Sequence, residues 1–234
     1  VPEYAAPIPG ESLATSVDIR PEALTIRYAH AAFTVDATWL VPLNEQGALV
    51  LLDVRTSEPL TLVVKFRVDL KPMWPAALGG QYSYWDNALK AYVAGEGSGK
   101  NAAIIGSPFG VDPPEQPAHN LPDAPTQFTI AITPETAAKG LVPIVIAASP
   151  EGLKAATATY QKLLASAAPL YAEAEQHYRQ VREQLTSINT PDDRLEIAQE
   201  FGAASSRGQA AKLRDQRFAI DHAIAIRDVV RIFR

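Results

Sequence analysis

The stretch "LTLVVKFRVDL", residues 60–70, decides the fold class of this chain. Apolar side chains recur in it at every second position, namely Leu62, Val64, Phe66 and Val68. From residue 65 onward the positions between them are charged, namely Lys65, Arg67 and Asp69. Successive side chains of a strand point to opposite faces of a sheet. The alternation therefore predicts a strand with one buried face and one face toward solvent.

Other segments on both sides of this strand are also rich in β-branched and aromatic residues. We expect strands at 12–19, 24–30, 33–41, 48–54, 88–95, 102–107, 127–133 and 142–148. Turn signals such as "RPE", "NEQG" and "TSEP" separate the first of them. Because the pattern between the strands is not helical, residues 1–148 are predicted to form an antiparallel sandwich or barrel rather than a parallel sheet.

The periodicity changes after residue 148. Apolar residues then recur every third or fourth position, at Leu153, Ala156, Tyr160, Leu163, Ala167, Leu170, Ala174, His177, Val181 and Leu185. This spacing predicts one face of a helix over residues 149–188. Pro169 interrupts the run, and it either kinks one long helix or begins a second one.

Residues 189–234 are predicted to be a further helical segment. In "INTPDDRLEIAQEF", 188–201, Thr190 is suited to cap a helix and Pro191 to occupy its first position. A second amphipathic stretch at 209–233 runs through Leu213, Ile220, Ile224 and Val230.

Composition and charge bear on the classes of partner. The chain is 47% hydrophobic, and no apolar run reaches the roughly 18 residues that a membrane span needs, so we expect no membrane partner. Its net charge is −5, but this charge is unevenly distributed. Residues 207–234 carry a charge of +4, from Lys212 and six arginines against three aspartates, so the rest of the chain carries −9. Because an acidic body does not favour phosphate binding, we expect no nucleic-acid partner, and the basic tail is predicted to be a solvated helix face rather than a contact arm.

The sequence also lacks most signatures of cofactor and metal chemistry. It has no cysteine, and its four histidines, His30, His119, His177 and His222, show no metal-ligand spacing. Neither a phosphate-binding nor a dinucleotide-binding fingerprint is present, and "GEGSGKN", 95–101, is predicted to be a hairpin turn. We therefore expect no cofactor and no metal.

The most unusual segment is "WPAALGGQYSYWD", residues 74–86, which concentrates aromatic rings around a Gly-Gly pair. Its candidate contact residues are Trp74, Tyr82, Tyr84, Trp85 and Asp86. Tyr and Trp combine an apolar face with a polar edge, which suits packing against another domain and also suits sugar rings. Because prolines and paired glycines do not continue a central strand, we expect 74–86 to leave the sheet as a loop, with Trp74 and Trp85 toward the helix that begins near Leu153.

Four carboxylates near this segment are candidates for acid–base chemistry, namely Asp86, Glu96, Asp112 and Asp123. A glycosidase needs two carboxylates about 5–10 Å apart across the sugar. Nothing in the sequence pairs any two of these four, so we assign none of them a catalytic role.

The order of several short motifs resembles a known family. "PMWPAALGGQYSYWD" is followed by "IIGSPFG", "VPIVIAAS" and a helix that ends in "INTPDDRLEIA". This order is similar to the N-terminal region of bacterial glycogen-debranching-type (amylo-α-1,6-glucosidase-like) six-hairpin glycoside hydrolases, over roughly residues 10–200. After "LEIA" this chain continues with "QEFGAASSRGQAAKLRDQ", which is small, polar and basic where the family has a tryptophan-containing helix.

The resemblance implies a fold and a function. It implies an antiparallel β-supersandwich at 1–148, a long linker helix at 149–188, and short helices at 189–234 that begin an (α/α)6 barrel. The family's catalytic carboxylates lie in that barrel, so no catalytic residue is carried over to this chain. Its expected function is then that of a non-catalytic domain of an enzyme acting on α-glucan-like carbohydrates, with the carbohydrate or the catalytic barrel as its partner. The alternative is a free-standing carbohydrate-binding β-sandwich.

Overall fold

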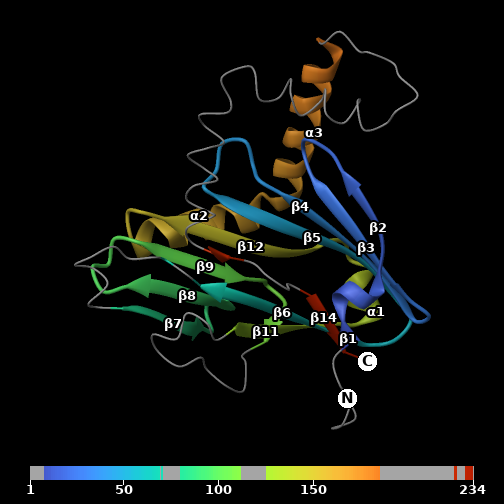
Figure 1. The fold of residues 1–234 in the computed structure, drawn as a ribbon, viewed down its shortest axis with the longest axis horizontal. Coiled ribbons are helices and arrows are strands. Elements are labelled where there is room, and N and C mark those ends of the chain that lie inside the picture. Colours follow the sequence, from blue (N-terminus) through green and yellow to red (C-terminus); the bar gives the residue numbers. More distant parts are fainter. Residues whose placement is uncertain are drawn as a thin grey trace.

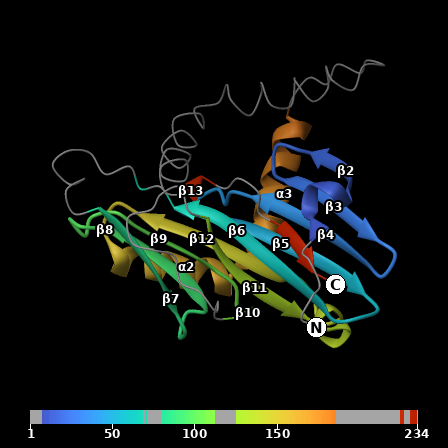
Figure 2. The ribbon, with the colours of Figure 1, turned by 60° about the horizontal axis from the view of Figure 1, so that its bottom comes forward.

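The computed structural model describes residues 8–68, 70, 80–111, 125–184, 224–225 and 230–233. Two antiparallel sheets face each other, and a helix covers the outer face of the larger sheet (Figures 1 and 2). The prediction of an antiparallel rather than a parallel sheet is therefore confirmed, and of the two predicted architectures, sandwich or barrel, the structure has the sandwich.

The larger sheet has eight strands in the order β2-β3-β4-β5-β12-β9-β8-β7, so its free edges are β2 and β7. The strands are β2 (Ala14–Ile19), β3 (Leu24–His30), β4 (Phe33–Leu40), β5 (Gly47–Thr56), β12 (Val142–Ser149), β9 (Ala102–Gly106), β8 (Ala91–Glu96) and β7 (Gln81–Asp86). Every neighbouring pair is antiparallel.

The smaller sheet has the order β1-β14-β6-β11-β10, and β13 also pairs with β6. Its strands are β1 (Ile8–Pro9), β14 (Val230–Phe233), β6 (Leu60–Val68), β11 (Thr126–Ile132), β10 (Gly110–Val111) and β13 (Ile224–Ala225). Two short helical turns complete the sandwich, a 3-10 turn η1 (Gly10–Leu13) and α1 (Pro134–Ala137).

The alternation in residues 60–70 places one face of β6 in the core between the sheets. Leu62, Val64, Phe66 and Val68 are all buried there. On the opposite face Arg67 is exposed and Lys65 is half-buried, as predicted, while Asp69 lies outside the described residues. Phe66 contacts two other buried rings edge-on, Tyr92 of β8 at 5.7 Å and Phe128 of β11 at 6.3 Å between ring centroids.

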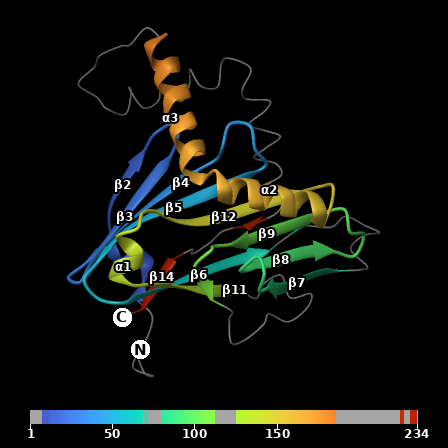
Figure 3. The ribbon, with the colours of Figure 1, turned by 180° about the vertical axis from the view of Figure 1, so that it is seen from behind.

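Helix α2 (Leu153–Ala165) packs on the outer face of the larger sheet, over β5, β9 and β12 (Figure 3). Its buried residues are Ala156, Tyr160 and Leu163, which belong to the stripe predicted from the sequence. Tyr160 also donates a hydrogen bond through its hydroxyl to the backbone carbonyl of Leu89, at 3.3 Å. A second apolar core thus lies between the helix and the sheet.

The close approach of α2 to the sheet leads to a prediction at Gly47 on β5. A Cβ at this position would lie 2.4 Å from Leu163 Cδ1 and 2.5 Å from the carbonyl oxygen of Ile146. Because the carbonyl belongs to the neighbouring strand and cannot move aside, we expect Gly47→Ala to lower the free energy of unfolding by about 1–3 kcal/mol in urea titrations. Ala131→Val adds methyl groups at an exposed position of β11 and serves as the control, with an expected change within about 0.5 kcal/mol. Equal stabilities of the two variants would contradict this account of the helix–sheet contact.

The helical stripe divides at Ser166 into α2 and α3 (Ala167–Glu183). Pro169 lies in the first turn of α3, where backbone N–H groups have no partner within the helix, so the proline costs no hydrogen bond. Of the two alternatives, the structure therefore has a second helix. Ala174 and Tyr178 are the buried residues of α3, whereas His177 is half-buried. Neither helix, nor any other in the described part of the chain, has the length and hydropathy of a membrane span.

The prediction of a helix at 209–233 is wrong for the residues that the structure describes there. Residues 224–225 and 230–233 are β13 and β14, and both pair with β6. The edge of β6 offers unpaired backbone N–H and C=O groups, which strand pairing satisfies. The predicted helix start at Thr190 and Pro191 lies outside the described residues, so the start of a helical barrel is not seen.

Candidate functional site

The second half of the aromatic segment forms strand β7, at one edge of the larger sheet. All six of its residues, 81–86, pair with β8. The prediction of a loop is therefore wrong for these residues, because their alternation of side chains suits an edge strand that needs only one hydrogen-bonded neighbour. Trp74 lies outside the described residues.

Trp85 faces the core between the two sheets, away from α2. Its ring centroid lies 5.3 Å from that of Tyr92 and 5.6 Å from that of Phe128, and its Nε1–H donates a hydrogen bond to Asn87 Oδ1 at 3.0 Å. The prediction that Trp85 lies on the helix side is therefore wrong. The alternation of side chains along β7 explains the position of Trp85, because alternate residues of the strand point to opposite faces and the face of Trp85 points between the sheets.

Tyr82 and Tyr84 occupy the opposite face of β7, the outer face of the sheet. Their cross-strand partners are Gly95 and Val93, and Val93 belongs to the apolar core beneath α2. The two tyrosine rings are nearly parallel, with 14° between their planes and 6.3 Å between their centroids. Tyr82 is half-buried, while Tyr84 is 41% exposed. Among the residues of this segment that the structure describes, these two rings are thus the aromatic side chains on the outer face of the sheet.

Gly95 makes room for one of these rings, a feature that the sequence analysis did not identify. A Cβ at Gly95 would lie 2.4 Å from the Tyr82 hydroxyl oxygen and 2.6 Å from Cζ of the same ring. The far end of the Tyr82 ring therefore lies over the bare Cα of the neighbouring strand. A glycine inside an otherwise apolar strand, as in "AYVAGE", is the signal that indicates such a close approach.

Asp86 serves the turn between β7 and β8. One of its carboxylate oxygens accepts hydrogen bonds from the backbone N–H groups of Ala88, at 2.8 Å, and Leu89, at 3.0 Å. Burial raises the pKa of the Tyr84 hydroxyl, and the negative charge of Asp86 raises it further, with a smaller contribution from Tyr82. Asp86 therefore affects the Tyr84 hydroxyl while its carboxylate accepts hydrogen bonds within the turn.

Glu96 is a buried carboxylate that organises the hairpin between β8 and β9. It is 1% exposed and accepts hydrogen bonds from the backbone N–H groups of Ser98, Lys100 and Asn101, at 2.6, 3.1 and 3.0 Å. The Ser98 hydroxyl and the Asn101 side-chain amide also donate to it. Burial alone would raise the pKa of Glu96, but these hydrogen bonds outweigh burial and lower its pKa to about 2. The predicted hairpin turn at 95–101 is thus confirmed.

The structure does not bring the described candidate carboxylates together as an acid–base pair. Asp86 and Glu96 lie at opposite ends of the β7–β8 pair, because Asp86 is opposite Ala91 and Glu96 is opposite Gln81. Five residue steps along a strand separate the two ends by about 17 Å, which exceeds the separation that a glycosidase uses. Asp112 and Asp123 lie outside the described residues.

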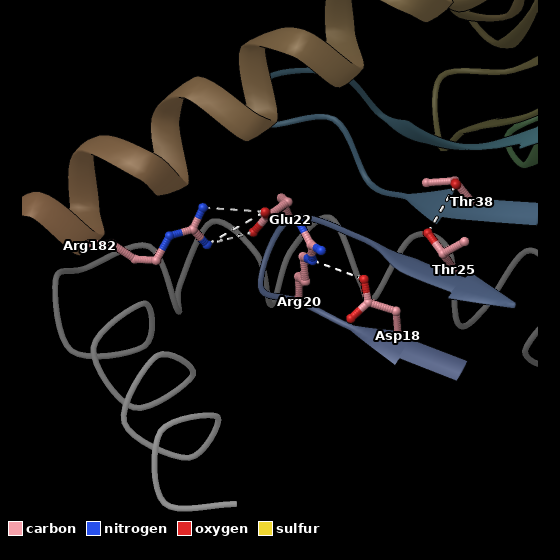
Figure 4. Close-up of polar contacts among 6 residues, drawn as sticks. All are labelled: Asp18, Arg20, Glu22, Thr25, Thr38 and Arg182. Carbon is pink, nitrogen blue, oxygen red and sulfur yellow. Dashed lines mark hydrogen bonds and ion pairs between the residues drawn. The ribbon is translucent and has the colours of Figure 1, made fainter. Parts of the chain in front are cut away.

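A further contact that sequence reasoning missed fixes α3 against the turn between β2 and β3 (Figure 4). The Glu22 side chain in that turn is 3% exposed, and its carboxylate lies 3.2 Å from Nη1 of Arg182 on α3. Beside it, Arg20 makes an exposed ion pair with Asp18 at 3.0 Å. The two members of the buried pair are 160 residues apart, so no local pattern in the sequence reveals it.

Two other polar contacts join the helices to the loop between β4 and β5. Lys162 of α2 forms an ion pair with Glu45 at 2.6 Å, and Asn44 donates a hydrogen bond to Glu173 of α3 at 3.3 Å. Two contacts therefore fix the direction of α3 against two loops of the sandwich, namely Glu22 with Arg182 and Asn44 with Glu173. The ion pair of Lys162 with Glu45 fixes α2.

The described side chains do not form a metal-binding site. Within this part of the chain, no three histidine, aspartate or glutamate side chains gather as ion ligands. His30 stacks on Phe33 and His177 contacts Tyr178 edge-on, each at 5.2 Å between ring centroids. His119 and His222 lie outside the described residues.

Comparisons with known proteins leave the family open. No family model matches the sequence, and no curated protein matches it either. Any function proposed for this chain therefore depends on its residues and its fold.

Proposed function

We propose that this chain is the non-catalytic N-terminal region of a glycoside hydrolase that acts on α-glucan-like carbohydrates. In this role the sandwich, a β-supersandwich in the six-hairpin enzymes, supports a catalytic (α/α)6 barrel. The helices α2 and α3 act as the linker that leads the chain from the sandwich toward that barrel. The resemblance of the motif order to debranching-type enzymes supplies the substrate class.

The observation that carries this proposal is the course of the chain after β12. Helix α2 lies flat on the larger sheet, whereas α3 turns at Ser166 and extends beyond the strands (Figures 1 and 3). Two polar contacts hold α3 in this direction, the partly buried pair of Glu22 and Arg182 and the hydrogen bond from Asn44 to Glu173. A helix that extends beyond the strands while it is fixed to loops of its own sandwich is suited to present a following domain in a defined orientation.

An assay of sugar release tests the non-catalytic assignment. The purified chain, incubated with malto-oligosaccharides and with a branched α-glucan, is expected to release no reducing sugar above the buffer blank. An active glucoamylase under the same conditions serves as the positive control. Robust hydrolysis by the chain alone would contradict the proposal.

A free-standing carbohydrate-binding sandwich is the second candidate function, and the exposure of Tyr84 favours it. The two functions differ in what the natural gene encodes after the codon for Arg234. A reading frame that continues into helical hairpins with paired acidic residues supports the domain of an enzyme. A stop codon at that point, together with saturable oligosaccharide binding, supports the binding module instead.

A further inference from the structure

We propose that Tyr82 and Tyr84 form a binding site for pyranose oligosaccharides on the outer face of β7. The choice of an α-glucan as the natural ligand rests on the function proposed above, whereas the site itself rests on the geometry of the two rings. Trp85, which the sequence grouped with them, is not part of this site because it packs between the sheets.

The two rings form one aromatic surface. They lie on the same face of β7, two residues apart, with 14° between their planes and 6.3 Å between their centroids. The end of the Tyr82 ring lies over the Cα of Gly95, because a Cβ there would come within 2.4 Å of its hydroxyl oxygen. The sheet thus supports the Tyr82 ring from below, and Tyr84 lies nearly parallel to it.

The position of the pair on the sheet leaves it beside the helix rather than under it. Helix α2 packs over β5, β9 and β12, whereas the tyrosines stand on β7, the edge strand beyond β8 and β9 (Figure 3). Tyr84 accordingly is 41% exposed although it stands next to a buried neighbour, Val93.

The size and chemistry of this surface favour a sugar over a protein. A stable protein partner covers about 800 Å² on each side of an interface. The other large apolar side chains that are exposed in the described residues, Val17, Ile19, Val41, Val111 and Leu141, lie on other elements. Two tyrosine rings instead offer apolar faces with hydroxyl tips, which match the C–H faces and the hydroxyl rims of two neighbouring sugar units.

Titration calorimetry with maltoheptaose and with cellohexaose tests the site. The chain is expected to bind one of these oligosaccharides with millimolar or tighter affinity, and Tyr84→Ala is expected to weaken binding at least about tenfold. Tyr84→Phe keeps the ring and is expected to retain most of the affinity. Leu141→Ala, which truncates an exposed apolar side chain elsewhere, is the matched control and is expected to bind like the parent chain.

The outcomes separate the site from the proposed function. Thermal unfolding of each variant shows whether a loss of binding reflects a loss of fold. Binding of cellohexaose alone, lost in Tyr84→Ala, would confirm the site and contradict the α-glucan assignment. Failure of the folded parent chain to bind either sugar, or equal binding by Tyr84→Ala and the parent chain, would overturn the site, even if the gene encodes a catalytic barrel downstream.

Discussion

Replacing Arg182 by Met is expected to release α3 from the sandwich. The substitution removes the guanidinium that faces Glu22, whose side chain is only 3% exposed, and keeps most of the apolar stem of the side chain. Breaking a buried ion pair on one side leaves an uncompensated charge, which costs several kcal/mol. Because the Arg182 side chain is itself about one-third exposed, we expect a cost at the low end of what such pairs show. Arg182→Met should lower the free energy of opening of α3 by about 3 kcal/mol.

Amide hydrogen exchange over residues 167–183 measures this opening directly. Arg179→Met is the matched control, since it makes the same substitution on an exposed position of the same helix. In the double variant Glu22→Leu with Arg182→Met no charge is buried, so exchange is expected to slow toward that of the parent chain. If Arg182→Met and Arg179→Met exchange at the same rate, the buried pair does not hold the helix.

Most strands of the sandwich could be predicted because each of these has a local signal, whereas β7 was predicted as a loop, and β13 and β14 as part of a helix. The alternation in β6 predicted both its extent and its buried face, and the change to a helical period near residue 150 predicted α2 and its buried residues. Both signals depend on the burial of every second or every third to fourth side chain, which the sequence displays directly.

The aromatic segment could not be placed from the sequence because two signals conflict in it. Pro75 and the Gly-Gly pair in its first half indicate a loop, while "QYSYWD" alternates like a strand. The composition of the whole segment suggested one surface of five contact residues. In the structure, alternate residues of β7 point to opposite faces of the sheet. Trp85 therefore packs in the core, while Tyr82 and Tyr84 lie on the outer face. The number of aromatic residues in a segment does not reveal this division between two faces, whereas the alternation of side chains along a strand does.

The contacts that fix α3 were beyond sequence reasoning for a different reason. Glu22 looks like an ordinary turn carboxylate, and Arg182 like an ordinary charged position on a helix. Their pairing depends on the route of the chain through twelve intervening strands and helices, which brings residues 160 positions apart into contact. Only the folded structure shows that the turn after β2 faces the end of α3.

Replacing Glu96 by Gln is expected to destabilise the sandwich in a manner that depends on pH. The folded-state pKa of Glu96 is about 2, against an ordinary value of 4.5, because five donors of the β8–β9 hairpin hold its charged form. A lowered folded-state pKa stabilises the fold above the unfolded pKa, and this contribution is lost as pH falls through the folded pKa. At neutral pH a difference of this size corresponds to about 3 kcal/mol.

Urea unfolding at pH 7 and at pH 3 tests this expectation. Gln cannot accept from every donor of the hairpin, because its amide group replaces one acceptor oxygen by a donor. The parent chain should therefore exceed Glu96→Gln in stability by about 3 kcal/mol at pH 7, and by about half as much at pH 3, where the parent has lost part of the contribution of its carboxylate. Glu58→Gln, at an exposed turn position, is the control and should change stability by less than about 0.5 kcal/mol at either pH. A difference between the parent and Glu96→Gln that is the same at both pH values would show that the packing of residue 96, and not its charge, stabilises the hairpin.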